Sequence, residues 1–216
     1  MTITRERFAQ GLTYDQFKAV LTRSKASFEA SERSVQLHDA DLIPFRDLPA
    51  KLDVLVLVTE TCPDVIMNVP ILERIAQESG KLNLRIFLRD DHTDIMASYM
   101  NGPYESVPVF VFLDPDWTEL GVWIERPKAV TELRERLTRE IYASNPEFGS
   151  SDAPPSDLPE EIRGRLQQAI RQMREDSGRD YARLSIRDLG EMVKGFASRT
   201  RLSGPVWRGN LAAVAV

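Results

Sequence analysis

The stretch that decides the fold is residues 61–76, which read TCPDVIMNVPILERIA. It follows residues 53–58, DVLVLV, a continuous apolar run rich in β-branched side chains. Such a run is typical of a strand that is covered on both faces. A helix is predicted from about residue 64 to 79, with Gly80 in the position where helices often end in the left-handed conformation. Cys62 therefore lies at the turn from a buried strand into a helix.

The elements that follow predict an α/β fold. Further strands are expected at residues 82–88, 107–113 and 120–124, and helices at 93–100 and 127–142. This order of elements describes a mixed, four-stranded sheet flanked by helices: strand, helix, strand, helix, an adjacent strand pair and a last helix.

Sequence of helical character flanks this domain on both sides. Apolar side chains before residue 45 recur at helical spacing around a break at Thr13–Asp15. Residues 42–48, which contain Pro44 and are followed by Pro49, are interpreted as a connection. Amphipathic helices are predicted at 160–176 and 186–196, followed by a tail from residue 202 without a period. The predicted boundaries are a helical extension over 1–45, a domain over 46–145, a Pro-, Ser- and Gly-rich linker over 146–159, and a helical extension over 160–216 that is dispensable for folding of the domain.

Composition limits the classes of partner. The chain has 216 residues, of which 42% are apolar and 28% charged, as in soluble globular proteins. Its net charge of −5 argues against nucleic acid as a partner. No apolar run approaches the roughly 18 residues that cross a bilayer, and the N-terminus lacks a signal-peptide core. We therefore expect a cytoplasmic protein without a membrane partner.

Cysteine and histidine are scarce. Cys62 is the single cysteine, which excludes an intrachain disulfide and a cysteine-rich zinc site. His38 and His92 are the only histidines and stand alone in the sequence, so no metal site is predicted. No cofactor is expected either.

Residues 61–76 resemble the active-site helix of thioredoxins, with the nucleophilic cysteine at Cys62 and the proline inside the helix at Pro70. Ser106-Val107-Pro108 resembles the thioredoxin segment whose cis-proline enters the third strand. The resemblance is closest to bacterial thioredoxin-like proteins with a helical N-terminal extension, and it leaves out roughly the last 60 residues. It implies a thioredoxin-like fold in which the Val107–Pro108 peptide bond is cis and lies beside the cysteine.

The candidate site combines Cys62, as the catalytic residue, with partner-binding residues Thr61, Pro63, Asp64, Val107 and Pro108. A cysteine at a helix start faces unpaired N–H groups and the positive end of the dipole, which stabilise a thiolate. We therefore predict a thiol pKa below about 8.5, an effect that the Asp64 carboxylate moderates. Backbone groups beside the cis-proline are suited to pairing with an extended peptide. The alternative is that Cys62 is simply a small buried apolar side chain.

Three positions depart from the thioredoxin pattern. Val65 occupies the place of the resolving cysteine, Thr61 that of an aromatic residue, and Val56 that of a buried acid. Without an internal thiolate to attack the mixed disulfide, ordinary dithiol cycling is excluded. Thr59 and Cys62 also match the Thr-x-x-Cys of peroxiredoxins, but Leu55 stands where that motif opens with proline, so we interpret the match as chance.

Two functions stay open on this evidence, of which we favour the first, a redox-related role, and keep the second as the alternative. In the first, Cys62 attacks a disulfide or peroxide, and glutathione or another external thiol resolves the product. In the second, the chain is a non-catalytic module that holds a partner protein in the groove at Pro108. The partner is accordingly a protein or a low-molecular-weight thiol or disulfide.

Overall fold

The computed structural model describes residues 2–199 and 207–208, and the chain divides into two compact units. Unit 1 comprises Met1–Pro127 with Ser185–Val216, and unit 2 comprises Lys128–Leu184. Most of the tail predicted from residue 202 lies outside the described residues. No helix in the described part is long and apolar enough to span a membrane.

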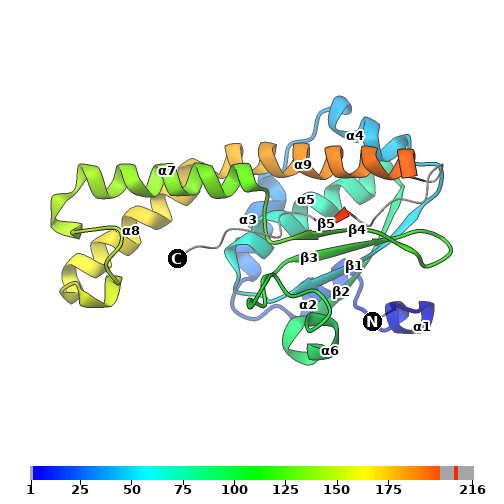
Figure 1. Cartoon of the computed structure of the whole chain (residues 1–216), viewed down its shortest axis with the longest axis horizontal. Helices are drawn as coiled ribbons and strands as arrows, with labels where there is room; N and C mark the ends of the chain where they lie inside the picture. The colour runs from blue at the N-terminus through cyan, green and yellow to red at the C-terminus, as the bar shows by residue number, and fades with distance from the viewer. Residues whose placement is uncertain (1, 200–206, 209–216) are drawn as a thin grey trace. The chain divides into compact units, whose positions relative to one another are not determined.

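Unit 1 contains the sheet and most of the helices (Figure 1). Its strands are β1 (Leu52–Val58), β2 (Leu82–Leu88), β3 (Val109–Leu113), β4 (Glu119–Ile124) and β5 (Trp207–Arg208). Its helices are α1 (Arg5–Ala9), α2 (Tyr14–Val20), α3 (Lys25–Ser34), α4 (Asp39–Arg46), α5 (Pro63–Ser79), the short 3-10 helix η1 (Arg89–Asp91), α6 (Thr93–Met96) and, from Ser185 onward, α9 (Gly178–Arg199).

The strands form one mixed sheet in the order β2-β1-β3-β4-β5. Strand β1 pairs parallel with β2 and antiparallel with β3, and β3 pairs antiparallel with β4. The four-stranded mixed sheet of the thioredoxin-like fold is thus confirmed, and β5 adds two residues that pair parallel with β4. The central strands are continuous apolar runs because both of their faces are covered: every residue of β3 is buried.

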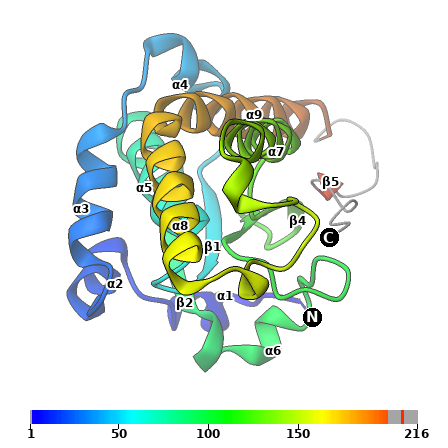
Figure 2. The ribbon, with the colours of Figure 1, turned by 90° about the vertical axis from the view of Figure 1, so that its left-hand side faces the viewer.

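Helices α4, α5 and the part of α9 in unit 1 cover one face of the sheet, and α1 and α6 lie toward the other (Figures 1 and 2). The ring of Phe196 on α9 lies 5.6 Å from that of Phe112 on β3. Trp123 stacks on Phe110 at 4.9 Å, and its Nε1 donates to Asp188 Oδ2 at 2.8 Å. The C-terminal part of α9 therefore belongs to the core of the thioredoxin-like unit.

The interpretation of residues 42–48 as a connection is wrong, because helix α4 occupies Asp39–Arg46 with Pro44 inside it. Asp41 Oδ2 accepts from the His38 N–H at 2.8 Å and so caps the start of the helix. Leu42 and Phe45, three residues apart, are both buried. Burial of this face outweighs the backbone hydrogen bond that proline cannot donate.

Unit 2 is helical. It contains α7 (Lys128–Ser144), the 3-10 helices η2 (Pro146–Phe148) and η3 (Pro155–Asp157), α8 (Glu160–Asp176) and the first residues of α9. Phe148 is buried and meets Tyr142 edge to face, with ring centroids 6.3 Å apart. Arg165 on α8 pairs with Glu147 at 2.6 Å. The segment predicted as a linker is therefore tied to α8 by an ion pair.

Candidate functional site

Cys62 is the N-cap residue of α5, at the end of the turn that leaves β1. Its backbone is extended (φ −72°, ψ 124°), and its carbonyl accepts the first helical hydrogen bond from the Ile66 N–H at 3.0 Å. Pro63 begins the helix, where a missing N–H costs nothing. Cys62 is half-buried, whereas Thr61 and Pro63 on either side of it are exposed.

The segment before β3 lies beside the cysteine, as the resemblance implied. The Val107–Pro108 peptide bond is cis. Cys62 Sγ donates to the Val107 carbonyl oxygen at 3.5 Å, across 45 residues of sequence. The structure thus brings together Cys62, Val107 and Pro108, and it places Asp64 in the first turn of the same helix.

Two charged residues missing from the sequence-based site lie next to it, in the loop after β4. Arg126 Nη1 donates to Asp64 Oδ2 at 2.6 Å and also to Glu125 Oε1. All three side chains are mostly buried, with exposed fractions of 18% for Arg126, 14% for Asp64 and 22% for Glu125. Glu125 has a φ of 64°, and its N–H donates to the Pro108 carbonyl at 2.8 Å. Sequence spacing gives no signal for this cluster, because Arg126 and Asp64 are 62 residues apart.

Asn68 joins the first turns of α5 to the same loop. It is 1% exposed, and its Nδ2 donates to the carbonyls of Asp64 at 2.9 Å and Glu125 at 3.4 Å. Its Oδ1 is buried and has no hydrogen-bond partner among the described residues. The turn at Cys62, the proline segment and the loop at Glu125 are therefore held in one arrangement by hydrogen bonds.

The prediction of a lowered thiol pKa is wrong in direction. Burial raises the pKa of Cys62 above its ordinary value, because a thiolate is poorly solvated there. The backbone N–H groups of Val65 and Asp64 act in the opposite direction, as expected at a helix start. The carboxylates of Asp64 and Glu125 then raise the pKa further. The helix start does favour the thiolate, but its surroundings outweigh that effect.

The three departures from the thioredoxin pattern have physical consequences. Val65 and Val56 are both fully buried, so apolar side chains occupy the places of the resolving cysteine and of the buried acid. Thr61, in the place of the aromatic residue, is exposed. No group at these three positions can accept a proton from Cys62 or attack a disulfide formed on it.

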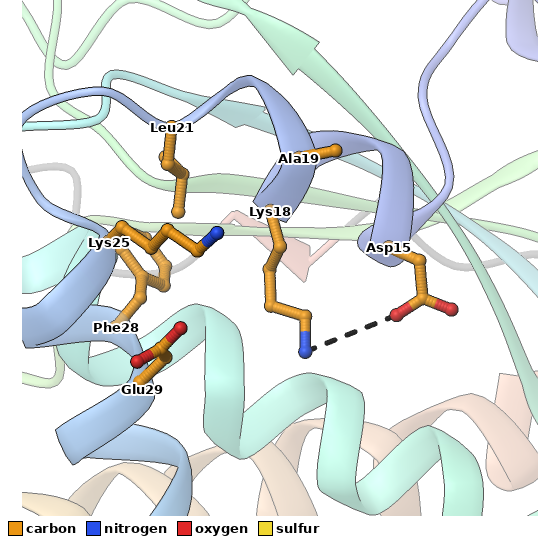
Figure 3. A pocket seen from close by; sticks show the side chains of 7 residues that line it. All are labelled: Asp15, Lys18, Ala19, Leu21, Lys25, Phe28 and Glu29. Atoms are coloured by element: carbon orange, nitrogen blue, oxygen red, sulfur yellow. Dashed lines mark ion pairs between the residues drawn. The ribbon is translucent and has the colours of Figure 1, made fainter.

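A separate pocket of about 260 Å³ lies among the N-terminal helices (Figure 3). Lys18 and Asp15 lie on one side of it, with Lys18 Nζ 4.0 Å from Asp15 Oδ1, and Phe28 lies on the other side. None of the residues around Cys62 lines it. Among the described residues, no three histidine, cysteine, aspartate or glutamate side chains gather as ligands for a metal.

Comparisons with known proteins agree with this fold. The chain is similar in structure to a protein of unknown function from Pseudomonas aeruginosa, with 16% identity, a TM-score of 0.59, and coverage of 89% of this chain and 98% of that one. It is also similar to an HIV epitope-scaffold, with 18% identity, a TM-score of 0.57, and coverage of 88% and 96%. At these identities the likenesses show the fold alone. No curated protein matches the chain. A model of the thioredoxin family matches residues 11–138, more than half of the chain, and the chain therefore belongs to the thioredoxin family.

Proposed function

We propose that this chain is a thioredoxin-fold binding module that holds a partner protein at the surface around Cys62 and Pro108, without thiol–disulfide turnover. The observation that carries the proposal is the state of the cysteine. Cys62 is half-buried, burial raises the pKa of its thiol, and Sγ lies 3.5 Å from the Val107 carbonyl oxygen, to which a protonated thiol donates a hydrogen bond. A protonated thiol is a poor nucleophile, so the site favours binding over exchange.

The surface next to the thiol is suited to a protein segment. Thr61 and Pro63 are exposed on either side of Cys62. The sulfur itself lies against the backbone of Val107, which fixes the distance between the helix start and the proline segment. A rigid surface of this kind loses little conformational entropy when a partner binds.

Monothiol chemistry is a second candidate, because the N–H groups of Val65 and Asp64 hydrogen-bond to the sulfur and favour its thiolate. In that reaction the Cys62 thiolate attacks a partner disulfide, forms a mixed disulfide and releases one partner thiolate, which takes up a proton. An external thiol such as glutathione then attacks the mixed disulfide and releases Cys62. The burial of Cys62 and the two carboxylates weigh against this candidate.

The two candidates differ in the reactivity of Cys62. The first measurement is the alkylation rate of Cys62 against pH, with a free cysteine derivative as the reference. A binding module is expected to show a midpoint at or above the reference, and a midpoint below it would support monothiol chemistry. The second measurement is reduction of a protein disulfide by dithiothreitol, with Cys62→Ser as the matched control. Faster reduction by the wild-type chain than by Cys62→Ser would refute the binding-only function.

Binding itself is tested with a displayed peptide library selected on the wild-type chain. Selected peptides are expected to bind Cys62→Ser with a similar Kd and to lose affinity for Thr61→Glu, which changes the exposed rim. Asp116→Asn is the control, because Asp116 lies in the turn at the opposite end of β3 and should not alter binding. Peptides that bind Thr61→Glu as well as the wild type would place the binding surface elsewhere.

A further inference from the structure

The first residues of the chain lie along the outer edge of strand β2, which is at one end of the sheet. Leu12 pairs antiparallel with Ile86 of β2, and each of these residues donates its N–H to the carbonyl of the other at 2.8 Å. A β-carbon added to Gly11 would lie 2.5 Å from Phe87 Cε2, so this close approach requires glycine. Residues 4–12 are called the edge clasp below.

Arg7 holds the edge clasp to the residues that follow β2. Its Nη2 donates to both carboxylate oxygens of Asp94 at 2.9 Å and lies 3.3 Å from Nδ1 of His92. Its guanidinium lies over the ring of Phe87, 6.0 Å from the centroid. The ring of His92 meets that of Phe87 edge to face, with centroids 5.0 Å apart. Arg7 and His92 therefore contact the same aromatic side chain and are held close together.

The contact between Arg7 and His92 depends on the charge of the imidazole. A guanidinium only donates hydrogen bonds, so Nδ1 can accept from Arg7 while the ring is neutral and cannot once both ring nitrogens carry a proton. Protonation also places two positive charges next to each other. The charged groups that face His92 are Arg7 on α1, Asp91 on η1 and Asp94 on α6, while β2 presents the uncharged ring of Phe87.

We propose that the edge clasp is a pH-sensitive cover of the sheet: protonation of His92 repels Arg7, and the clasp then opens from the edge of β2. The N–H of Gly11 donates to the Phe8 carbonyl at 3.1 Å, which connects the helix that carries Arg7 to the pairing with β2. Opening frees the N–H and carbonyl of Ile86, and an unpaired strand edge can pair with a strand of another chain. This inference goes beyond the proposed function and does not depend on it.

The surroundings of His92 give the sign of the effect. Burial lowers the pKa of His92, and the Arg7 guanidinium lowers it further, against the opposing effects of Asp94 and Asp91. A lowered pKa means that protonation disfavours the folded arrangement. Stability is therefore full above the ordinary pKa of 6.5 and falls as the pH drops through the lowered value. We expect a closed clasp at neutral pH and an opened clasp in mildly acidic solution.

Amide hydrogen exchange tests the proposal, because the N–H groups of Leu12 and Ile86 donate the two hydrogen bonds of the pairing. Their protection factors are measured by NMR at about pH 7.5 and about pH 5. They are divided by those of Leu55 and Val111, which pair with each other in the central strands and report opening of the whole sheet. We expect this ratio to fall about fivefold at the lower pH, the effect of two like charges about 4 Å apart in water. The fall should follow the titration of the His92 ring protons.

The two histidines of the chain provide matched variants. His92→Gln is expected to remove the pH dependence of the ratio, whereas His38→Gln, at the exposed start of α4, should leave it unchanged. Arg7→Gln removes the repelled charge and should give the same, lower protection at both pH values. The reference amides correct for Glu73 and Asp188, whose pKa values are raised by burial toward the same pH range.

A wild-type ratio that is equal at the two pH values overturns the proposal, and this measurement needs no variant to fold. The same result includes the case in which all four amides lose protection together, because acid would then unfold the whole unit and not the clasp. A fall that persists in His92→Gln also overturns it, since another group would then control the edge of β2.

Discussion

Replacing Phe196 with alanine tests whether helix α9 is part of the thioredoxin-like core. Phe196 is 2% exposed, and its ring packs against Phe112 at 5.6 Å. A phenylalanine buries roughly 150–250 Å². At about 25 cal/mol per Å² this gives about 4–6 kcal/mol, an upper bound because the unfolded chain also buries part of the side chain. We therefore expect Phe196→Ala to lower the free energy of unfolding by about 3–5 kcal/mol.

Tryptophan fluorescence during urea unfolding measures this loss. All three tryptophans belong to unit 1, and residues 128–184 contain none, so the signal reports the unit that holds Phe196. With a urea dependence of about 2 kcal/mol per M, the midpoint should fall by about 2 M. The matched control is Phe148→Ala in unit 2, where Phe148 is 3% exposed. Its main effect should be a loss of helical circular dichroism, with a smaller change in the fluorescence midpoint.

The result that would refute this reasoning is an unchanged fluorescence midpoint for Phe196→Ala. It would agree with the expectation from the linker composition, that residues 160–216 are dispensable for folding. A shortened chain that ends near Gly149 tests the same question, whether α9 is needed for folding, by removing the whole helix. It lacks the whole buried face of α9, whose members include Ile186, Leu189 and Val193. On the packing described above, this shortened chain should unfold without a cooperative transition.

Three further predictions address single side chains. Burial raises the pKa of Glu73, so ionisation of this carboxyl destabilises the folded state. Glu73→Gln should therefore raise the midpoint of urea unfolding at pH 7. This gain should shrink as the pH falls through the raised pKa toward the ordinary value of 4.5, because the wild-type carboxyl is then protonated. Asp188→Leu leaves the Trp123 N–H without its acceptor and should cost about 1–3 kcal/mol in urea unfolding, with a smaller cost for Asp188→Asn, which keeps an acceptor. Val65→Cys places a second thiol three residues after Cys62, and thiol counting after oxidation should find no free thiols; two remaining thiols would contradict the geometry at the helix start.

Much of the fold could be predicted from the sequence because its signals are local. Strand β2 and helix α8 have the predicted bounds, since each is set off by turn residues or by a clear apolar period. Helix α5 ends at Gly80, whose φ of 67° is the left-handed conformation that glycine adopts without strain. Helix α4 was not predicted because Pro44 disfavours a helix locally. The burial that stabilises this helix depends on packing against residues that are distant in the sequence.

The position of the cysteine could also be predicted, but its chemistry could not. Cys62 caps α5 and lies beside Val107, as the resemblance implied. The contribution of Glu125 and Arg126 depends on the loop after β4 meeting the first turn of α5. The spacing of these residues along the chain does not indicate this contact. A local motif therefore cannot predict whether the pKa of a cysteine at a helix start is raised or lowered.

The magnitudes explain why the surroundings of Cys62 outweigh the helix. A helix terminus stabilises a nearby charge by about 0.3–1 kcal/mol when it is exposed. Removing a thiolate from water costs more as burial increases, and carboxylates within several ångströms add repulsion of similar size. Asp64 is the first charged residue of the helix, where an acidic side chain stabilises the helix itself. The residue that supports the helix start thus opposes the thiolate that the helix start would favour, and Arg126, by pairing with that carboxylate, limits the repulsion without removing it. A thiol held in this way supports the proposal of a binding module over that of a monothiol redox protein.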